Sequence, residues 1–345
     1  MAEPRPSRIR VLVVDDSALM RRLICDILES APGMVVAGTA RNGAEALQKV
    51  RELNPDVVTL DIEMPVRDGL SALQDIMNER PVPVVMLSAM NKRQADITMK
   101  ALEMGAVDFF PKTSGTISLD LEKVSGDLLG KLRTAAGIRR LARQHPRPVP
   151  VDWPRFVPRN GRGLVVIGAS TGGPGALTEV LGGLPRDIPA AILIVQHMPE
   201  GFTQSFAERL NWITSLEVRE ARHGDELHAG VALVAPGDRH MTIENGRIAL
   251  SDGPPVNNVR PSVDVLMKSA AEFCSGCIGV LLTGMGADGA EGLREIKRFD
   301  GRTLVQDEAT CVVFGMPRAA IDLGAADRVV PLGDMARNIL TALEE

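Results

Sequence analysis

The chain has 345 residues, which is enough for two domains of ordinary size. Its hydrophobic fraction of 45% and charged fraction of 24% are typical of a globular protein, so a core of normal size can form. A net charge of -5 gives no global sign of nucleic-acid binding, and four cysteines in a chain this long do not make a disulfide framework.

The N-terminus is polar, and the apolar run that follows it at residues 11–14 is too short for the hydrophobic part of a signal peptide. No uninterrupted apolar segment approaches the ~18 residues that indicate a transmembrane helix. These features predict a cytoplasmic protein.

The segment from residue 8 to residue 115 alternates apolar, strand-like runs with stretches that carry apolar residues at helical spacing. Such an alternation predicts a doubly wound parallel sheet with helices on both faces. The strand-like runs lie at residues 10–16, 34–40, 56–62, 82–89 and 106–112.

Polar side chains follow several of these strands, and the carboxyl ends of parallel strands meet at one edge of a sheet. Asp15 and Asp16 follow the first strand, Asp61 the third, Ser88 the fourth and Lys112 the fifth. An oxygen-rich cluster of this kind suits Mg²⁺, and a carboxylate beside such an ion can accept a phosphoryl group. Each residue alone has a simpler reading, such as an Asp that caps the next helix.

The motifs LVVDDSALMR, TLDIEMPVRDG, LSA and FFPK make this segment resemble a response-regulator receiver domain, which is flavodoxin-like. The resemblance implies that Asp61 is the phosphoacceptor and that Asp15 and Asp16, together with Asp61, bind Mg²⁺. It further implies that Ser88 and Lys112 contact the phosphoryl oxygens.

Phe109 occupies the position of the aromatic switch in that family. The resemblance implies that Phe109 repacks inward when Asp61 is phosphorylated, and that a chemotaxis histidine kinase is the phosphodonor.

Residues 116–162 form a linker in this interpretation. Its first part carries apolar residues at helical spacing, which predicts the last receiver helix and a continuation of it. Five prolines between residues 146 and 158 then indicate an extended, semi-rigid spacer. Lys and Arg outnumber acids here, which fits either a solvated linker or a basic patch that meets an acidic partner surface.

The stretch LVVIGASTGGPG at residues 164–175 predicts a buried strand, a sharp glycine-rich turn and a helix that has Pro174 in its first turn. Ser170 lies in the turn, with little side chain around it. A nucleophilic serine needs this exposure and backbone N–H groups nearby for an oxyanion. A phosphate-binding glycine loop and a plain tight turn are the alternatives.

Residues 163–345 repeat the pattern of strand, glycine loop and helix, which predicts a second, mostly parallel sheet in a three-layer, Rossmann-like domain. Ser170, His197 and Asp288 each follow an apolar strand-like run, so they are expected at one sheet edge. A serine, a histidine and an acid in one place suggest a hydrolytic triad. Their order differs from that of the common α/β-hydrolases, and His240 is the rival base.

The pair Cys274 and Cys277 forms a C-x-x-C motif. A zinc site needs four ligands, and no second pair completes one. A redox pair would be expected to open a helix, whereas this pair leads into an apolar strand-like run. Structural thiols are therefore expected.

Six motifs give residues 163–345 a resemblance to the chemotaxis protein-glutamate methylesterases: IGASTGGPGAL, IVQHMPEGFT, APGDRHM, PPVNNVRPSVDVL, LLTGMGADGA and QDEATCVVFGMPRAA. The resemblance assigns the catalytic triad to Ser170, His197 and Asp288. It places Thr171 and Met285 beside the triad, where the glycine loop around Met285 is expected to supply part of the oxyanion stabilisation.

The resemblance implies an enzyme that hydrolyses methyl esters of chemoreceptor glutamates and deamidates certain glutamines, gated by phosphorylation and without a cofactor for the ester chemistry. The implied partners are methyl-accepting chemoreceptors, through which alone it meets the membrane. We expect a monomer. A receiver-coupled binding module without catalysis is the competing class, whereas a transcription factor would need a helix-turn-helix that the second domain does not show.

Overall fold

The structure is a computed structural model, and it describes residues 8–112, 121–138 and 163–345. The chain divides into two compact units, residues 1–144 (unit 1) and residues 145–345 (unit 2), and each unit is described by itself. The proline-rich part of the predicted linker lies outside the described residues. None of the helices in the described ranges combines the length and the apolar character that a bilayer crossing requires.

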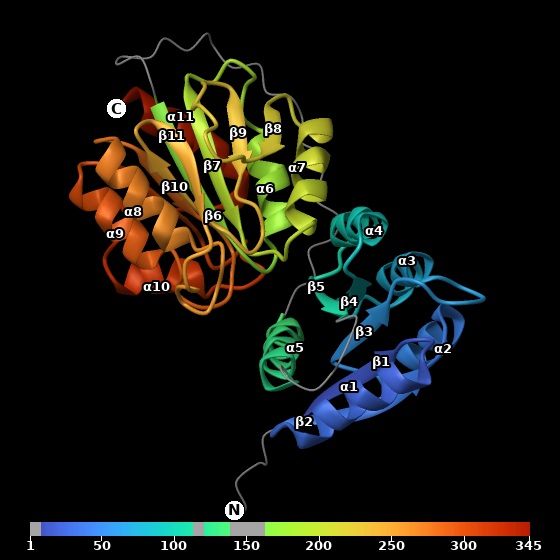
Figure 1. The fold of residues 1–345 in the computed structure, drawn as a ribbon. Coiled ribbons are helices and arrows are strands. Elements are labelled where there is room, and N and C mark those ends of the chain that lie inside the picture. The colour runs from blue at the N-terminus through green and yellow to red at the C-terminus, as the bar shows by residue number, and fades with distance from the viewer. Residues whose placement is uncertain (1–7, 113–120, 139–162) are drawn as a thin grey trace, which may run out of the picture. The chain divides into compact units, whose positions relative to one another are not determined.

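Unit 1 contains a five-stranded sheet in the order β2-β1-β3-β4-β5, with every neighbouring pair parallel (Figure 1). The predicted flavodoxin-like fold is confirmed. The order reverses between β1 and β3, and such a reversal is where open α/β sheets bind ligands. The strands are β1 (Ile9–Val14), β2 (Met34–Ala40), β3 (Val57–Asp61), β4 (Val84–Ala89) and β5 (Asp108–Lys112).

The helices of unit 1 begin where short polar side chains bind the backbone N–H groups of the first turn. Ser17, Asn42, Asp68 and Asn91 accept such hydrogen bonds ahead of α1 to α4. The last helix, α5, packs against β3, β4 and β5, although the sequence analysis placed its residues in the linker segment. The helices are α1 (Ala18–Ser30), α2 (Gly43–Leu53), α3 (Gly69–Glu79), α4 (Lys92–Glu103) and α5 (Leu121–Ala136).

Unit 2 contains a seven-stranded sheet in the order β14-β13-β12-β6-β7-β9-β8, and all its neighbouring pairs are parallel. The order reverses between β6 and β12. Most residues of the central strands are buried, as expected for a sheet covered on both faces. The strands are β6 (Gly163–Ala169), β7 (Ala190–Gln196), β8 (Glu217–Glu220), β9 (Val231–Val234), β12 (Ile278–Leu281), β13 (Arg302–Gln306) and β14 (Arg328–Val330).

Helices cover both faces of this sheet, which confirms the predicted three layers (Figure 1). On one face α8 contacts α9, which contacts α10, and on the other face α6 contacts α7 and α11. The helices are α6 (Gly173–Gly182), α7 (Phe202–Ile213), α8 (Val263–Phe273), α9 (Ala290–Arg298), α10 (Met316–Asp322) and α11 (Met335–Glu344), with a short 3₁₀ turn, η1 (Leu332–Asp334), before α11.

An antiparallel hairpin, β10 (His240–Glu244) and β11 (Arg247–Ser251), packs against α8. The sequence analysis did not predict it. Its turn is Asn245-Gly246, and both residues have positive φ (50° and 76°), as a tight hairpin turn requires. An Asn-Gly pair between alternating apolar residues was the available signal.

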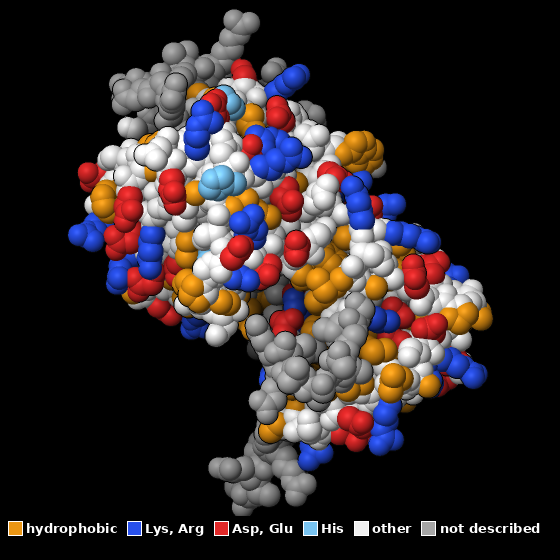
Figure 2. Space-filling view, in the orientation of Figure 1, with side chains coloured by type: hydrophobic (Ala, Val, Ile, Leu, Met, Phe, Trp, Pro, Cys, Tyr) orange, Lys and Arg blue, Asp and Glu red, His pale blue; other side chains and the backbone are white. Residues whose placement is uncertain are grey.

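The surface of both units mixes charges of both signs on the face shown in Figure 2. On α7 the Trp212 side chain is exposed, and the guanidinium carbon of Arg209 lies 4.7 Å from the centroid of its ring. Cys277 is buried ahead of β12, and burial raises the pKa of its thiol to about 12. A thiol in that state is inert, in accord with the structural role expected for the C-x-x-C motif.

Candidate functional site

The carboxyl edge of the unit 1 sheet gathers three carboxylates. Asp15, Asp16 and Asp61 each offer an oxygen, and these oxygens all lie within 4.8 Å of one another. Asp15 and Asp61 are buried, whereas Asp16 is exposed. The cluster therefore lies where the strand order reverses, at the ends of β1 and β3.

The ammonium group of Lys112 joins two of these carboxylates. Its Nζ lies 2.7 Å from Asp15 Oδ2 and 2.7 Å from Asp61 Oδ1. Burial alone would lower the pKa of Lys112, but its hydrogen bonds with Asp15 and Asp61 raise it above the ordinary value. Burial raises the pKa of Asp61 to about 6 although Lys112 lowers it, and the charges of Asp15 and Asp16 add to the rise.

Three carboxylates outnumber the single ammonium, so the cluster keeps an excess of negative charge at neutral pH. Carboxylate oxygens at the carboxyl edge of the sheet suit Mg²⁺, which prefers hard oxygen ligands. This ion usually retains several waters and takes few ligands from the protein. The exposed position of Asp16 leaves the cluster open to solvent on one side. The donor set and its charge therefore fit a magnesium ion.

Ser88 and Phe109 lie in the neighbouring strands β4 and β5, and both are buried. The Oγ1 atom of Thr98 lies 2.8 Å from Ser88 Oγ. The Nζ atom of Lys131 lies 5.7 Å from the centroid of the Phe109 ring. The inward repacking expected for Phe109 would thus start from a ring that is already inside.

The loop after Asp61 is shaped by close backbone contacts. Arg67 N donates to Pro65 O (2.7 Å), which makes a tight turn around Val66, whose φ is 68°. A Cβ atom on Gly69 would lie 2.0 Å from the carbonyl oxygen of Asp61. Only glycine fits there, so the Asp-Gly pair of the sequence motif places the next helix directly against the predicted phosphoacceptor. A surface hollow beside this loop is lined by Asp16, Ile62, Glu63, Met64, Pro65, Asp68, Leu70, Arg93 and Ile97.

In unit 2, backbone hydrogen bonds fix Ser170 at the end of β6. Its N–H donates to Thr283 O (3.0 Å), and its carbonyl oxygen accepts from Gly173 N (2.7 Å) and from Gln196 Nε2 (2.9 Å). Gly172 has a φ of 79°, and a Cβ atom there would lie 2.5 Å from Val312 Cβ. The turn therefore needs glycine, and the predicted strand, turn and helix are all present.

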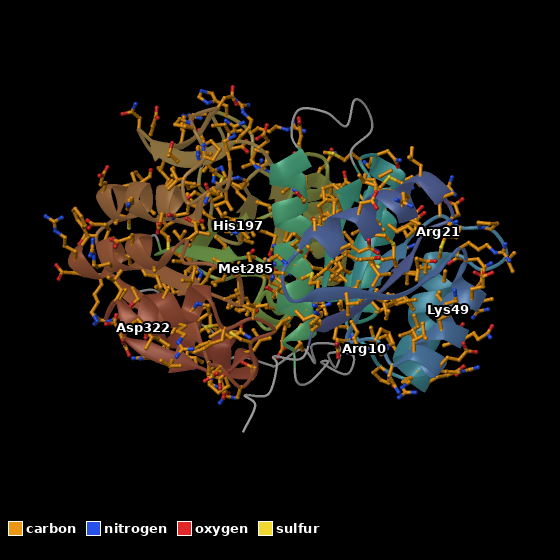
Figure 3. The ribbon with its side chains drawn as sticks, turned by 90° about the horizontal axis from the view of Figure 1, so that it is seen from below. Arg10, Arg21, Lys49, His197, Met285 and Asp322 are labelled. Atoms are coloured by element: carbon orange, nitrogen blue, oxygen red, sulfur yellow. The ribbon has the colours of Figure 1, made fainter. Side chains whose placement is uncertain are left out.

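His197 and Asp288 are in direct contact, 91 positions apart in the sequence. His197 Nε2 lies 2.8 Å from Asp288 Oδ2. A hydrogen on Nε2 that bonds this carboxylate leaves Nδ1 as the basic nitrogen. The described part of the chain contains no Ser170–His197 hydrogen bond, and catalytic hydrogen bonds are often loose before substrate binds. Figure 3 labels His197 and Met285, which lie toward the same edge of unit 2.

Asp288 is enclosed by hydrogen-bond donors. Its Oδ1 accepts from Ser262 Oγ (2.6 Å) and Asn257 Nδ2 (2.9 Å), and its Oδ2 accepts from Val263 N (2.6 Å). Burial alone would raise the pKa of Asp288, but the hydrogen bonds from His197, Ser262 and Asn257 hold it below the ordinary value. Asp288 is therefore ionised at neutral pH.

The rival base, His240, is buried at the start of β10. Its Nδ1 accepts a hydrogen bond from Ser262 N (3.2 Å), so its Nε2 carries the hydrogen and donates to Pro254 O (3.0 Å). Both ring nitrogens are thus occupied. His240 has no free nitrogen with which to take a proton from a nucleophile, and this favours His197.

The glycine loop after β12 passes close to Ser170. A Cβ atom on Gly284 would lie 2.7 Å from Ser170 Cβ and 2.2 Å from Met316 Sδ. Gly284 N donates to Val313 O (3.0 Å), and Gly289 N donates to Asp264 Oδ1 (3.0 Å), so these two amides are engaged. The predicted oxyanion role of this loop stays a prediction.

The two other residues of that prediction differ in exposure. The side chain of Met285 is about half exposed at the tip of the loop. Thr171 is buried, and its carbonyl oxygen accepts from Thr283 Oγ1 (3.0 Å). Their assignment beside the triad is likewise a prediction.

Sequence reasoning missed the side chains that hold the candidate triad in place. Gln196 is the last residue of β7, and its amide binds the carbonyl oxygens of both Ser170 and His197 (2.9 and 3.2 Å). Thr283 Oγ1 donates to Thr171 O, in the turn after Ser170, and Ser262 Oγ donates to the carboxylate of Asp288. The position of Gln196, at the end of a buried strand, was the one available signal.

Two family models match the chain. The response regulator receiver domain matches residues 11–121, and CheB methylesterase matches residues 165–339. The second match covers about half of the chain by itself.

Curated relatives match over nearly the whole length. The protein-glutamate methylesterase/protein-glutamine glutaminase of Symbiobacterium thermophilum is 48% identical, over 98% of both chains. That of Pyrococcus horikoshii is 46% identical, over 98% of this chain and 94% of the relative. The CheB methylesterase catalytic domain of Thermotoga maritima, a crystal structure, is 43% identical with a TM-score of 0.50, over 52% of this chain and 97% of that one.

Proposed function

The chain belongs to the CheB methylesterase family, and from this premise we propose that phosphorylation of its receiver activates a Ser170-His197-Asp288 triad toward methylated chemoreceptors. The chain is a protein-glutamate methylesterase and protein-glutamine glutaminase with a receiver domain. In the proposed organisation residues 8–115 are the receiver, residues 116–162 the linker and residues 163–345 the catalytic domain.

The first half of the proposed reaction forms an acyl-enzyme. Ser170 Oγ attacks the carbonyl carbon of a glutamate methyl ester while His197 Nδ1 takes the hydroxyl proton. The tetrahedral intermediate collapses, the bond to the methoxy oxygen breaks, and the imidazolium returns the proton to the leaving group. Methanol departs, and the glutamyl group stays on Ser170 as an ester.

Water completes the reaction. His197 takes a proton from a water molecule that attacks the acyl carbon, and the proton then passes to Ser170 Oγ as the bond to the serine breaks and the receptor's glutamate side chain leaves as a carboxylate. A glutamine side chain follows the same route with ammonia as the leaving group. Asp288 holds the hydrogen on Nε2 and stabilises the imidazolium without itself becoming protonated.

One observation carries this proposal: the 2.8 Å contact between His197 Nε2 and the buried, ionised Asp288. A binding module without catalysis would not require a buried, ionised Asp288 in contact with His197 next to the turn that holds Ser170. The engagement of both His240 nitrogens supports the same choice of base.

The test compares Ser170→Ala with the parent in methanol release from membranes that carry methylated chemoreceptors. We expect release to fall at least ~10⁴-fold, while phosphorylation of Asp61 by a small phosphodonor is unchanged. Ser215→Ala, at an exposed serine of the same unit, is the matched control and retains the parent rate. Methanol release at the parent rate from Ser170→Ala would overturn the assignment.

In the receiver, Asp15, Asp16 and Asp61 would hold Mg²⁺, which when bound offsets negative charge at the phosphoacceptor. Lys112 already lies 2.7 Å from Asp61 Oδ1, where its ammonium can bind a phosphoryl oxygen attached to that carboxylate. Ser88, at the end of the next strand, is the proposed second contact. A chemotaxis histidine kinase is the proposed phosphodonor.

The proposed control is occlusion: the unphosphorylated receiver obstructs the catalytic site, and phosphorylation, with repacking around Ser88 and Phe109, releases it. A phosphodonor with Mg²⁺ should raise the methylesterase activity of the full chain and have no effect on Asp61→Asn. Deletion of residues up to about Pro150 should raise basal activity and abolish the response. If the shortened chain is no more active than the unphosphorylated parent, occlusion is wrong.

The proposed enzyme serves adaptation in chemotaxis. Its substrates are the cytoplasmic domains of methyl-accepting chemoreceptors, and it meets the membrane through them alone. We propose that it works as a monomer without a nucleic-acid partner and that it needs no cofactor for the ester chemistry.

A further inference from the structure

A second buried carboxylate lies behind the candidate triad, and the proposed reaction does not use it. Asp264, in the first turn of α8, is 3% exposed, as is Asp288. Its Oδ1 accepts from Gly289 N (3.0 Å) and Gly292 N (2.7 Å), which are backbone amides of the segment that directly follows Asp288. Asp264 thereby fixes the start of α9 and with it the position of Asp288.

One side chain joins the two acids. The Nδ2 group of Asn257 donates to Asp264 Oδ2 (2.8 Å) and to Asp288 Oδ1 (2.9 Å). These two bonds use both amide hydrogens, so Asn257 satisfies one oxygen of each carboxylate. Asn257 is exposed on its outer side, and its backbone is left-handed, with a φ of 53°. Asparagine adopts this conformation at low cost and also supplies the two donors.

Two anions held this close repel each other, and the groups around them decide how much of that repulsion is offset. His197 faces Asp288 from the end of β7, and Ser262 bonds it from the start of α8. Burial and the charge of Asp288 raise the pKa of Asp264 above its ordinary value, although the hydrogen bonds from Gly292 and Asn257 and the charge of Lys268, further along α8, lower it. His240 lies on the other side of Ser262, where its Nδ1 accepts from Ser262 N.

We propose that Asn257 is a positioning residue for ester hydrolysis, because its amide joins Asp264 and Asp288 and so sets how strongly Asp288 attracts the proton on His197. This inference rests on the proposed function. Without the amide, Asp288 loses a donor and becomes a stronger base. With an aspartate in its place, a third negative charge stands beside the pair. Both changes favour the protonated imidazolium, which cannot act as the base.

The test is the pH profile of kcat/KM for methanol release from methylated chemoreceptor membranes, with the full chain in EDTA so that the receiver stays unphosphorylated. Asn257→Asp should move the acid limb to higher pH by about one unit, which lowers kcat/KM roughly tenfold on the acid side. Asn257→Gly, which deletes the side chain and accommodates the left-handed backbone, should move the limb the same way by a smaller amount.

The neighbouring Asn258 is the matched control. It is exposed, its φ is 64°, and it lies in the same loop. Asn258→Asp and Asn258→Gly introduce the same charge and backbone changes, and the acid limb should stay at the parent position. Thermal unfolding of all four variants identifies any that do not fold.

Three outcomes decide the proposal. A limb that moves in the Asn257 variants and not in the Asn258 variants supports it. Equal loss of rate at every pH in a folded Asn257 variant would mean a structural role alone, and an unchanged profile would mean no role, so either result overturns it. Failure of the underlying mechanism looks different, because Ser170→Ala would then retain activity.

Discussion

Each of the two sheets has its site at its own carboxyl edge, and the two sites differ in how the charge of their carboxylates is balanced. In each sheet the strand order reverses, and acidic or hydroxyl side chains follow the two strands that flank the reversal, whereas Lys112 and His197 come from the ends of β5 and β7. Unit 1 places Asp15, Asp16 and Asp61 there with Lys112, and so concentrates charge in a site open to ions. Unit 2 buries two carboxylates, Asp288 and Asp264, without an ammonium between them, and encloses them with hydrogen-bond donors.

The helices after the strands differ in a matching way. In unit 1 polar side chains such as Ser17 and Asp68 cap α1 and α3, so the backbone donors near the carboxylates are already bonded. In unit 2 α6 and α9 begin at left-handed glycines, Gly172 and Gly289, which have no side chain of their own to cap the helix. At α9 the distant carboxylate of Asp264 takes this place, because it accepts from Gly289 N and Gly292 N. The same type of sheet thus holds a carboxylate cluster joined by one ammonium in unit 1 and a carboxylate pair joined by a neutral amide in unit 2, and the residues at the strand ends decide between the two.

The largest expected effect separates the two sites. Ser170→Ala and His197→Ala should each lower turnover of methylated receptors by at least ~10⁴-fold, and the double variant should be no worse than either, because triad residues act as a unit. Both variants should accept phosphate on Asp61 at the parent rate, since the two sites belong to different units. The measurements are methanol release and phosphorylation from a small phosphodonor.

Additive losses in the double variant would contradict this prediction, because they would mean that the two side chains act in separate steps. Loss of phosphorylation together with turnover would show that the substitutions unfold the chain. Circular dichroism of each variant is the control.

The second prediction removes charge from unit 1. The pKa of Asp61 is about 6 against an ordinary value of 3.8, so the folded chain binds more protons between these values and loses stability as the pH rises through them. Without Mg²⁺, Asp61→Asn should therefore raise the unfolding free energy by about 2 to 3 kcal/mol near neutral pH. The gain should vanish at pH values below the ordinary pKa.

Urea unfolding in EDTA at several pH values measures this gain. Asp26→Asn, at an exposed helix position, is the control and should change stability by less than about 0.5 kcal/mol at any pH. A gain from Asp61→Asn that does not depend on pH would contradict the prediction. Adding Mg²⁺ should reduce the gain, because the ion stabilises the parent and binds the variant less well.

The smallest effect is expected from His240, the rival base in unit 2. His240→Ala leaves Ser262 N and Pro254 O without their partner and should cost about 2 kcal/mol of unfolding free energy, with turnover within roughly tenfold of the parent. His197→Ala should show the reverse, with deep loss of turnover and little change in stability. If His240→Ala loses turnover as deeply as His197→Ala while folded, the choice of base is wrong.

The sequence predicted both sheets and the edge at which each site lies, because strand ends can be read from where an apolar run stops. Asp61 and Lys112 were placed in one cluster on that basis alone, and the structure joins them at 2.7 Å. The same reasoning brought His197 and Asp288 together. Their chemical roles stay predictions.

Other features depend on contacts that no local pattern encodes. Asn257 has a left-handed backbone, and its amide donates to two acids that belong to later segments of the chain. The orientation of the His197 ring, with Nε2 toward Asp288, depends on a contact between residues 91 positions apart. The β10–β11 hairpin is different, because its Asn-Gly turn is a local signal that the sequence carries.

The exposed Trp212 on α7 has a consequence for spectroscopy. The chain has no tyrosine and two tryptophans, Trp212 and Trp153, of which Trp153 lies outside the described residues. Unit 1 from residue 8 to residue 138 therefore contributes only phenylalanine to the near-ultraviolet spectrum and is silent in tryptophan fluorescence. Any change of tryptophan emission on phosphorylation of Asp61 must therefore come from a tryptophan outside the receiver. Such a change would report, without an added label, that phosphorylation alters the rest of the chain.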